Sequence, residues 1–208
     1  DGLQRLRISS IEINELTDEV LDIIKNSPVV VNHLHIPIQA ASDNVLKAMN
    51  RKYDLKTYMD RIRTIKTIKE DMSISTDIIV GHPYETDEDF KASLDAIREI
   101  GFSKLHVFPY SKRNGTKSAL MPQVDEVTKK RRARILLDLS REEEIKYMNK
   151  FIGKNIEVLI ETNNGEYSLG HTTNYLHVKI YSDNHKSEDL VNVKLTKVEY
   201  PFIIGECN

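Results

Sequence analysis

The segment 75–90, which reads STDIIVGHPYETDEDF, constrains the fold of this chain more than any other stretch. An apolar run ends at Gly81 and Pro83, which interrupt a strand, and a polar loop follows. Thr86 or Asp87 can then cap a helix. A strand, a polar loop and a helix in this order form the unit with which an α/β barrel builds a ligand site at the carboxyl ends of its strands.

The same layout recurs across the first half of the chain and predicts an α/β fold. Strands are expected over 6–12, 29–36, 73–80 and 104–110, and helices over 17–26, 43–49, 55–69 and 87–100. Strands that alternate with helices form parallel sheets. Because four strands are fewer than the ~8 of a closed parallel barrel, we predict an incomplete parallel βα barrel.

The pattern changes near residue 152, where we predict the boundary between a first domain, 1–151, and a second domain, 152–208. A long helix over 127–151 precedes the boundary, and Gly153 ends that helix. Short alternating strands are expected after it, over 156–161, 167–171, 176–180, 190–198 and 202–206. This density of short strands indicates a small antiparallel β-barrel of the OB-like kind.

Charge and cysteine content narrow the class of protein. The chain has 30 Lys and Arg against 32 Asp and Glu, so no bulk electrostatic partner is implied. Cys207 is the only cysteine, which excludes an internal disulfide framework. No apolar run approaches the ~20 residues of a membrane span, and no signal segment opens the chain. We therefore expect a cytoplasmic protein that has no membrane partner.

Polar side chains gather where the predicted strands end, which is where barrel enzymes hold their functional groups. These positions are Glu12, His33, His35, Gln39, Asp77, Glu85, His106 and Tyr110. The two histidines of the second strand share a face and could bind a metal. Hydrogen-bonded core histidines are the more common case, so we assign no metal site from the sequence.

Two further groups of side chains could contact RNA. The long helix opens with the basic run Lys129, Lys130, Arg131, Arg132 and Arg134, which either contacts phosphates or forms a solvated helix face. The second domain carries Tyr167, His171, Tyr175 and His177, which either stack on bases or fill the barrel interior. The net acidity of this domain, with 5 Lys, no Arg and 8 Asp and Glu, weighs against a general RNA-binding surface.

Several ordered motifs resemble the radical S-adenosylmethionine (SAM) methylthiotransferases. In the first domain they are RISSIE (7–12), HLHIPIQAASDNVLKAMNRKY (33–53), TDIIVGHPYETDEDF (76–90) and HVFPYSKRNGT (106–116). In the second domain GKNIEVLIE (153–161), LGHTTNYLHVKI (169–180) and YPFIIGE (200–206) resemble the TRAM domain, the small RNA-binding β-barrel of these enzymes. HVFPYSKRNGT followed by MPQVDE is most similar to the branch that acts on N6-threonylcarbamoyladenosine in tRNA.

The resemblance implies a transferase that adds a methylthio group to C2 of N6-threonylcarbamoyladenosine at position 37 of tRNA. It implies SAM and two [4Fe–4S] clusters as cofactors, and tRNA and a reductant protein as partners. The family binds one cluster through a C-x3-C-x2-C loop and the other through cysteines of an N-terminal domain, and this chain has only Cys207. We therefore expect the C-terminal part of a longer protein, without a cluster or a catalytic residue of its own and inactive alone.

The resemblance also assigns cofactor contacts. Glu12, at the end of its strand, would hold the methionine amino group of SAM, and Gln39 and Asp77 would reach the ribose hydroxyls. Arg51 would pair with the methionine carboxylate, which suits a planar guanidinium. The loop near the adenine would be shaped by Gly81 and Pro83. The RNA contacts would come from Lys129, Lys130, Arg131, Arg132, Tyr175 and His177.

The chain departs from the family pattern at two loop positions. Ala41 and Tyr84 replace glycines, and a side chain makes positive φ costly, so these loops are expected to sit differently from those of the family.

Several alternatives stay open at this point. Within the family these are the sister branch acting on isopentenyladenosine in tRNA and a branch that modifies a ribosomal protein. A non-catalytic RNA-binding module is one alternative of another class. Another is a metal hydrolase whose ligands would be His33, His35 and Asp77. This alternative needs further ligands on other strands, and the sequence offers few beyond Glu12 and His106. The uncovered edge of an incomplete sheet also predicts self-association.

Overall fold

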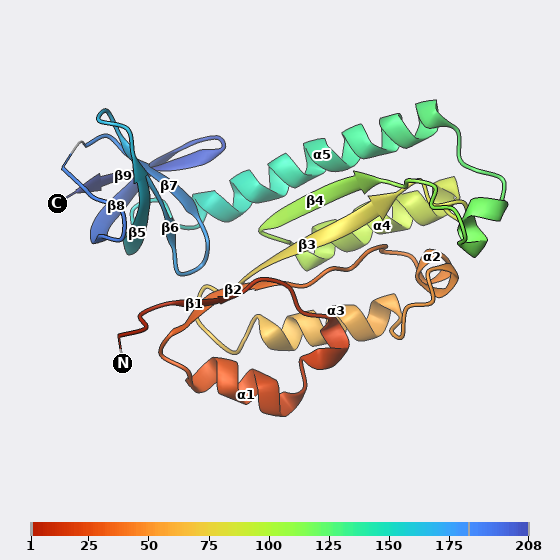
Figure 1. Ribbon diagram of the computed structural model, residues 1–208, viewed down its shortest axis with the longest axis horizontal. Coiled ribbons are helices and arrows are strands. Elements are labelled where there is room, and N and C mark those ends of the chain that lie inside the picture. The colour runs from red at the N-terminus through yellow and green to blue at the C-terminus, as the bar shows by residue number, and fades with distance from the viewer. Residues whose placement is uncertain (1, 183, 208) are drawn as a thin grey trace.

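The computed structural model describes residues 2–182 and 184–207, and it contains a parallel sheet with helices followed by a closed β-barrel (Figure 1). The sheet has the strand order β1-β2-β3-β4, and every neighbouring pair is parallel. Its strands are β1 (Leu6–Ile8), β2 (Val30–His35), β3 (Ser73–Val80) and β4 (Lys104–Pro109). The predicted α/β class with a parallel four-stranded sheet is thereby confirmed.

The helices lie where apolar periodicity and caps predicted them, with small differences at their ends. They are α1 (Asp18–Asn26), α2 (Asp43–Ala48), α3 (Leu55–Ile65), α4 (Asp87–Ile100) and α5 (Glu126–Asn149). Two short 3-10 helices, η1 (Ile13–Glu15) and η2 (Lys117–Leu120), lie in connections. Among the described residues, no helix is both long and apolar enough to cross a membrane.

The first strand is shorter than the expected 6–12. β1 ends at Ile8, and the register of its pairing with β2 shifts between Leu6 and Ile8. Ile11 still donates a backbone hydrogen bond to the carbonyl of His35 over 3.1 Å. Glu12 follows as the N-cap residue of η1. The prediction that Glu12 ends a strand is therefore wrong, because the chain leaves the ladder before it reaches this residue.

The second part of the chain forms a closed barrel with the order β5-β6-β7-β9-β8. Its strands are β5 (Asn155–Asn163), β6 (Ser168–Thr172), β7 (His177–Ile180), β8 (Leu190–Glu199) and β9 (Phe202–Cys207). The expectation of an antiparallel barrel is wrong for one pair, since β7 and β9 run parallel. Five strands in a ring cannot all alternate in direction, so closure requires at least one parallel pair.

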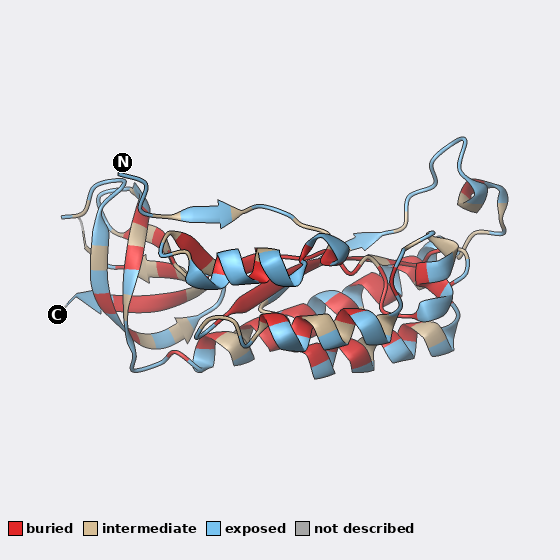
Figure 2. Cartoon of the chain, turned by 90° about the horizontal axis from the view of Figure 1, so that it is seen from below, coloured by how far each residue is buried: buried red, intermediate tan, exposed pale blue. Residues whose placement is uncertain are grey.

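Side chains of the sheet alternate between two faces. Ile74, Ile78 and Val80 of β3 point toward the helices and belong to a buried cluster with apolar residues of α1, α3, α4 and α5. The opposite face, which we call the inner face, carries polar side chains: His33, His35, Ser75, Asp77 and His106. Figure 2 shows the buried residues concentrated along one side of each helix.

The long helix α5 covers one edge of the sheet and reaches the barrel (Figure 1). The Ser140 hydroxyl accepts a hydrogen bond from the Leu105 amide over 3.1 Å and lies 3.2 Å from the Leu105 carbonyl, to which it donates. Met148 and Phe151, at the other end, pack into the barrel core. The β4 edge is thus covered by α5, and among the described residues the uncovered edge is that of β1.

Candidate functional site

A cavity of about 720 Å³ lies at the carboxyl ends of the parallel strands, and we call it the strand-end pocket. Three of the residues predicted to contact a cofactor line it: Gln39, Arg51 and Asp77. They come from the connection after β2, the connection after α2, and β3. The structure therefore brings together Gln39 and Asp77, which the sequence placed at separate strand ends, and Arg51, which the family resemblance added.

Hydrogen bonds fix the positions of these residues. The backbone N–H of Gln39 donates to the backbone carbonyl of Asp77 over 2.9 Å. The backbone carbonyl of Gln39 accepts from the backbone N–H of Ile79 over 2.8 Å. Gln39 itself has φ of 62°, an uncommon backbone state for a residue with a side chain. Arg51 donates through Nη1 to Glu12 Oε1 over 2.9 Å, so Glu12 joins the pocket through its ion pair.

The loop after β3 depends on Gly81. Its φ is +78°, and a Cβ at this position would lie 2.3 Å from Cγ of Lys129. Its amide donates to Glu85 Oε1 over 3.1 Å. Pro83, half-buried, lies in the same loop. Ala41 and Tyr84, by contrast, are not among the residues with positive φ, so neither position requires glycine here.

A buried ion pair ties this loop to α5. Arg132 donates to Glu85 Oε1 over 2.6 Å and to Asp87 Oδ1 over 2.8 Å. Burial raises the pKa of Glu85, while the Gly81 amide and the Arg132 guanidinium act in the opposite direction. The Arg132 side chain is only 4% exposed, so its guanidinium binds carboxylates of this loop and is not available to a ligand at the surface.

The basic run at the start of α5 is therefore divided between interior and surface. Lys129 and Arg132 are buried, and Lys129 pairs with Glu126. Lys130 and Arg131 are exposed. Of the four basic residues predicted to contact RNA, only Lys130 and Arg131 are therefore exposed, and Arg131 Nη2 lies 3.7 Å from Asp87 Oδ1.

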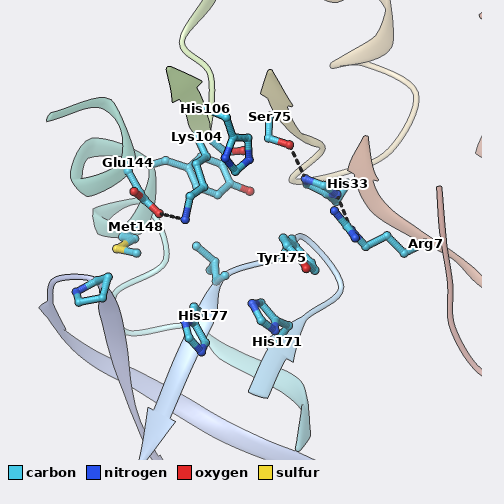
Figure 3. A pocket seen from close by; sticks show the side chains of 14 residues that line it. Arg7, His33, Ser75, Lys104, His106, Glu144, Met148, His171, Tyr175 and His177 are labelled. Carbon is cyan, nitrogen blue, oxygen red and sulfur yellow. Dashed lines mark hydrogen bonds and ion pairs between the residues drawn. The ribbon is translucent and has the colours of Figure 1, made fainter. Parts of the chain in front are cut away.

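A second cavity, of about 290 Å³, lies between the inner face and the barrel (Figure 3). We call it the sheet–barrel cavity. Its lining includes Arg7, His33, Ser75, Lys104 and His106 from the sheet, Glu144 and Met148 from α5, and His171, Tyr175 and His177 from the barrel. Lys104 Nζ lies 3.5 Å from Glu144 Oε1, and this pair spans one side of the cavity.

A column of stacked rings crosses from the sheet to the barrel beside this cavity. The ring of Tyr175 lies 4.6 Å from that of His33 and 4.3 Å from that of His171, and His171 stacks on His177 at 4.6 Å. The Arg7 guanidinium lies 4.2 Å from the centre of the Tyr175 ring. Tyr175 and His177, predicted to stack on bases, thus stack on other protein rings in this structure.

Two histidines of this column, His33 and His177, are held neutral. Burial, with a further contribution from Arg7, lowers the pKa of His33 to about 3. Burial also lowers the pKa of His177 to about 4. Both rings therefore act as neutral hydrogen-bonding and stacking groups at pH 7.

Between the two cavities the inner face carries His35, Asp77 and His106. His35 Nε2 lies 3.3 Å from Asp77 Oδ1, and one ligand atom from each of the three residues lies within 4.8 Å of the others. His33 is not in this group; its Nε2 bonds Ser75 Oγ over 3.0 Å, and its Nδ1 lies 3.4 Å from Arg7 Nε. The trio considered from sequence, His33, His35 and Asp77, is therefore only partly assembled.

Several residues of these sites were not predicted. Ser75, Lys104 and Glu144 line the sheet–barrel cavity, and His82 and Arg113 line the strand-end pocket. A signal for Ser75 was present, because a residue two positions before Asp77 on a strand shares its face. The contribution of Glu144 depends on how α5 packs, and no local pattern indicates it.

Comparison with known proteins shows what this chain is similar to. The profile of the Radical SAM superfamily matches residues 3–97. Coproporphyrinogen III oxidase of Escherichia coli, described as a radical SAM enzyme, superposes with a TM-score of 0.56 at 19% identity over 67% of this chain and 32% of its own. A likeness at this identity shows a shared fold and no more.

Curated relatives give a narrower relationship. The threonylcarbamoyladenosine tRNA methylthiotransferase MtaB of Bacillus subtilis is 40% identical over 99% of this chain and 47% of its own length. The tRNA-2-methylthio-N(6)-dimethylallyladenosine synthase of Desulfitobacterium hafniense is 37% identical over 100% of this chain and 47% of its own. The chain spans about half the length of these relatives. It is a homologue of tRNA methylthiotransferases, and the predicted resemblance to the radical SAM methylthiotransferases is confirmed.

Proposed function

We propose that this chain supplies a SAM-binding pocket and an RNA-holding barrel to a tRNA methylthiotransferase that acts on N6-threonylcarbamoyladenosine at position 37. The observation that carries the proposal is the convergence of Gln39, Arg51 and Asp77 on one cavity, with Glu12 held at Arg51. Two carboxylates, a guanidinium and an amide are the groups that an amino-acid nucleoside requires from its binding site.

The donor set of the pocket fits SAM. Arg51 uses only Nη1 for Glu12, so its other donors remain available to a carboxylate ligand. Asp77 and Gln39 meet through the backbone and can present acceptor oxygens to neighbouring hydroxyls. When bound, SAM supplies the radical precursor and the methyl group. The role of this chain is to bind and orient that cofactor and to hold the Gly81 loop in place.

No group of thiols for an iron–sulfur cluster exists in this chain, since Cys207 is its only cysteine. We therefore propose that both clusters are held by other parts of a longer protein, and that a reductant protein serves one of them. The chain alone would bind ligands and would not complete the reaction.

We propose that the barrel is a TRAM domain that begins near residue 152 and holds tRNA. Lys130 and Arg131 at the start of α5 present positive charge to the phosphates. Tyr175 and His177 would reach bases only if their stacking on the other protein rings were broken. We therefore propose that this chain contacts tRNA mainly through phosphates and less through bases. We also place the protein in the cytoplasm, where tRNA is modified.

The choice of substrate rests on the motif HVFPYSKRNGT followed by MPQVDE. The two kinds of tRNA-modifying relative differ by only three percentage points of identity, 40% against 37%, so identity alone does not choose between them. The motif borders the strand-end pocket through Tyr110 and Arg113, and this position supports a role for the motif in substrate choice.

The test is mass spectrometry of tRNA nucleosides from a strain lacking the gene. We expect 2-methylthio-N6-threonylcarbamoyladenosine to disappear while its parent nucleoside accumulates. If the 2-methylthio group is lost from the isopentenyladenosine derivative instead, the methylthiolation reaction is supported but the substrate is that of the sister branch. An unchanged profile would refute tRNA methylthiolation.

Complementation tests the pocket. The full-length gene with Asp77→Lys should fail to restore the modified nucleoside, whereas Asp95→Lys, a charge reversal on the exposed face of α4, should restore it. SAM binding by the full-length protein should fall at least about tenfold for Asp77→Asn, as expected for losing a charged acceptor. Undiminished binding would refute the assignment of Asp77.

A further inference from the structure

We propose that His35, Asp77 and His106 form a binding site for a late first-row divalent cation, of the class of Zn²⁺ and Co²⁺. The site lies on the inner face, between the two cavities: Asp77 lines the strand-end pocket, and His106 lines the sheet–barrel cavity, where Figure 3 shows it. It involves three neighbouring strands, and it shares Asp77 with the strand-end pocket while His35 and His106 lie outside the lining of that pocket.

Strand register brings the three ligands together. Asp77 and His106 are direct partners in the parallel pairing of β3 with β4. His35 is the partner of Ser75, which lies two residues before Asp77 on the same face of β3. Ligand atoms from all three lie within 4.8 Å of one another. Metal–nitrogen bonds of ~2.1 Å place tetrahedral ligand atoms roughly 3.4 Å apart, so side-chain adjustments of about 1 Å close the site.

The hydrogen bonds around the cluster leave a nitrogen of His35 free for a metal. The Nδ1 of His35 lies 2.9 Å from Ser75 Oγ, and a hydroxyl oxygen that accepts from Nδ1–H leaves the lone pair on Nε2. That Nε2 is the atom that faces Asp77 Oδ1. An outer hydrogen bond of this kind is what orients most metal-binding histidines.

The neighbouring histidine is compatible with this arrangement. Arg7 can only donate, and its Nε lies 3.4 Å from Nδ1 of His33, so His33 carries its proton on Nε2. His33 Nε2–H then donates a hydrogen bond to Ser75 Oγ over 3.0 Å. The two lone pairs of the hydroxyl oxygen can accept from both His33 and His35. Arg7, His33 and Ser75 therefore position His35 without binding the cation themselves.

The donor set selects the class of cation. Two imidazoles and one carboxylate suit Zn²⁺, Co²⁺ and related ions, whereas Mg²⁺ and Ca²⁺ prefer oxygen ligands throughout. Three protein ligands also leave a coordination position for water or for a small ligand.

The experiment is a titration of the untagged chain with Co²⁺, followed by its visible d–d absorption and by competition with Zn²⁺. A Cys207→Ser background is used, because Cys207 Sγ lies 3.4 Å from His185 Nε2 and could form a separate site. We expect one equivalent of tightly bound cation. His35→Ala and His106→Ala should each weaken binding at least about 100-fold, and Ser75→Ala about 10- to 100-fold.

Matched controls separate this site from surface binding. His171→Ala and His177→Ala remove imidazoles beside the same cavity that are not ligands, and each should leave the affinity within about twofold. His106→Gln, which keeps a polar side chain, serves if His106→Ala does not fold. The absence of saturable Co²⁺ binding, full affinity in a folded His106 variant, or equal losses in the control variants would each overturn the proposal.

Discussion

Acidification should destabilise this protein through His33, and the size of the effect follows from its environment. His33 is 1% exposed, and its pKa is lowered from 6.5 to about 3. Below pH ~6.5 the His33 side chain is protonated in the unfolded chain, whereas in the folded protein it stays neutral down to pH ~3. The free energy of unfolding therefore falls as the pH falls through this window. Between pH 7.5 and pH 5.0 a single group with these two values costs about 2 kcal/mol of unfolding free energy.

The perturbation is His33→Gln, which keeps an amide near Ser75 and cannot titrate. Urea unfolding followed by circular dichroism at pH 7.5 and pH 5.0 gives the loss of stability on acidification for each protein. We expect the wild type to lose about 2 kcal/mol more than the variant over this interval. His177, whose pKa is lowered to about 4, is present in both proteins and cancels in the difference. Equal losses would refute the view that His33 is held neutral by burial.

Three further perturbations test the packing around the sites by urea unfolding. Gly170→Ala would place a Cβ 2.1 Å from the carbonyl oxygen of Leu159, so a loss of about 3 kcal/mol is expected, and a loss below about 1 kcal/mol would contradict the close approach of β5 and β6. Arg132→Met would leave the Glu85 carboxylate buried without its partner and should cost about 3–5 kcal/mol, with partial recovery when Glu85→Gln is added; an unchanged double variant would contradict the pairing. Ser140→Ala should cost about 1 kcal/mol and speed hydrogen exchange at the covered edge of β4, whereas unaltered exchange would show that the hydroxyl does not protect that edge.

Much of the fold could be predicted because its signals are local. The apolar run of β3 stops at Gly81, and the Thr86 side chain accepts from the Asp89 amide over 3.1 Å, so α4 begins at Asp87 as expected. The end of β1 could not be predicted, because alternation continues through Ile11 after the ladder has shifted. The parallel pairing of β7 with β9 follows from closing the ring, which no short stretch of sequence encodes.

The candidate site was predictable where it depends on strand ends and unpredictable where it depends on distant partners. Gln39 and Asp77 meet in one pocket because parallel strands bring their carboxyl ends to one edge, whereas Arg51 reaches the pocket from the connection after α2. The burial of Arg132 depends on Glu85, which lies far away in the sequence and meets it only when α5 packs beside α4. The stacking of Tyr175 on His33 likewise requires the barrel to dock on the inner face.

The helix α5 gives the molecule a fixed internal spacing. Its 24 residues span about 36 Å as a continuous rod. Near one end Arg132 is bonded to the loop of the strand-end pocket, and near the other Met148 is embedded in the barrel core. Because α5 is anchored at both ends, its length fixes the distance between the barrel and the strand-end pocket. If the barrel holds tRNA as proposed, only a segment of the nucleic acid at that distance would reach the pocket. Any force that shifted the barrel along this axis would pull on the Gly81 loop.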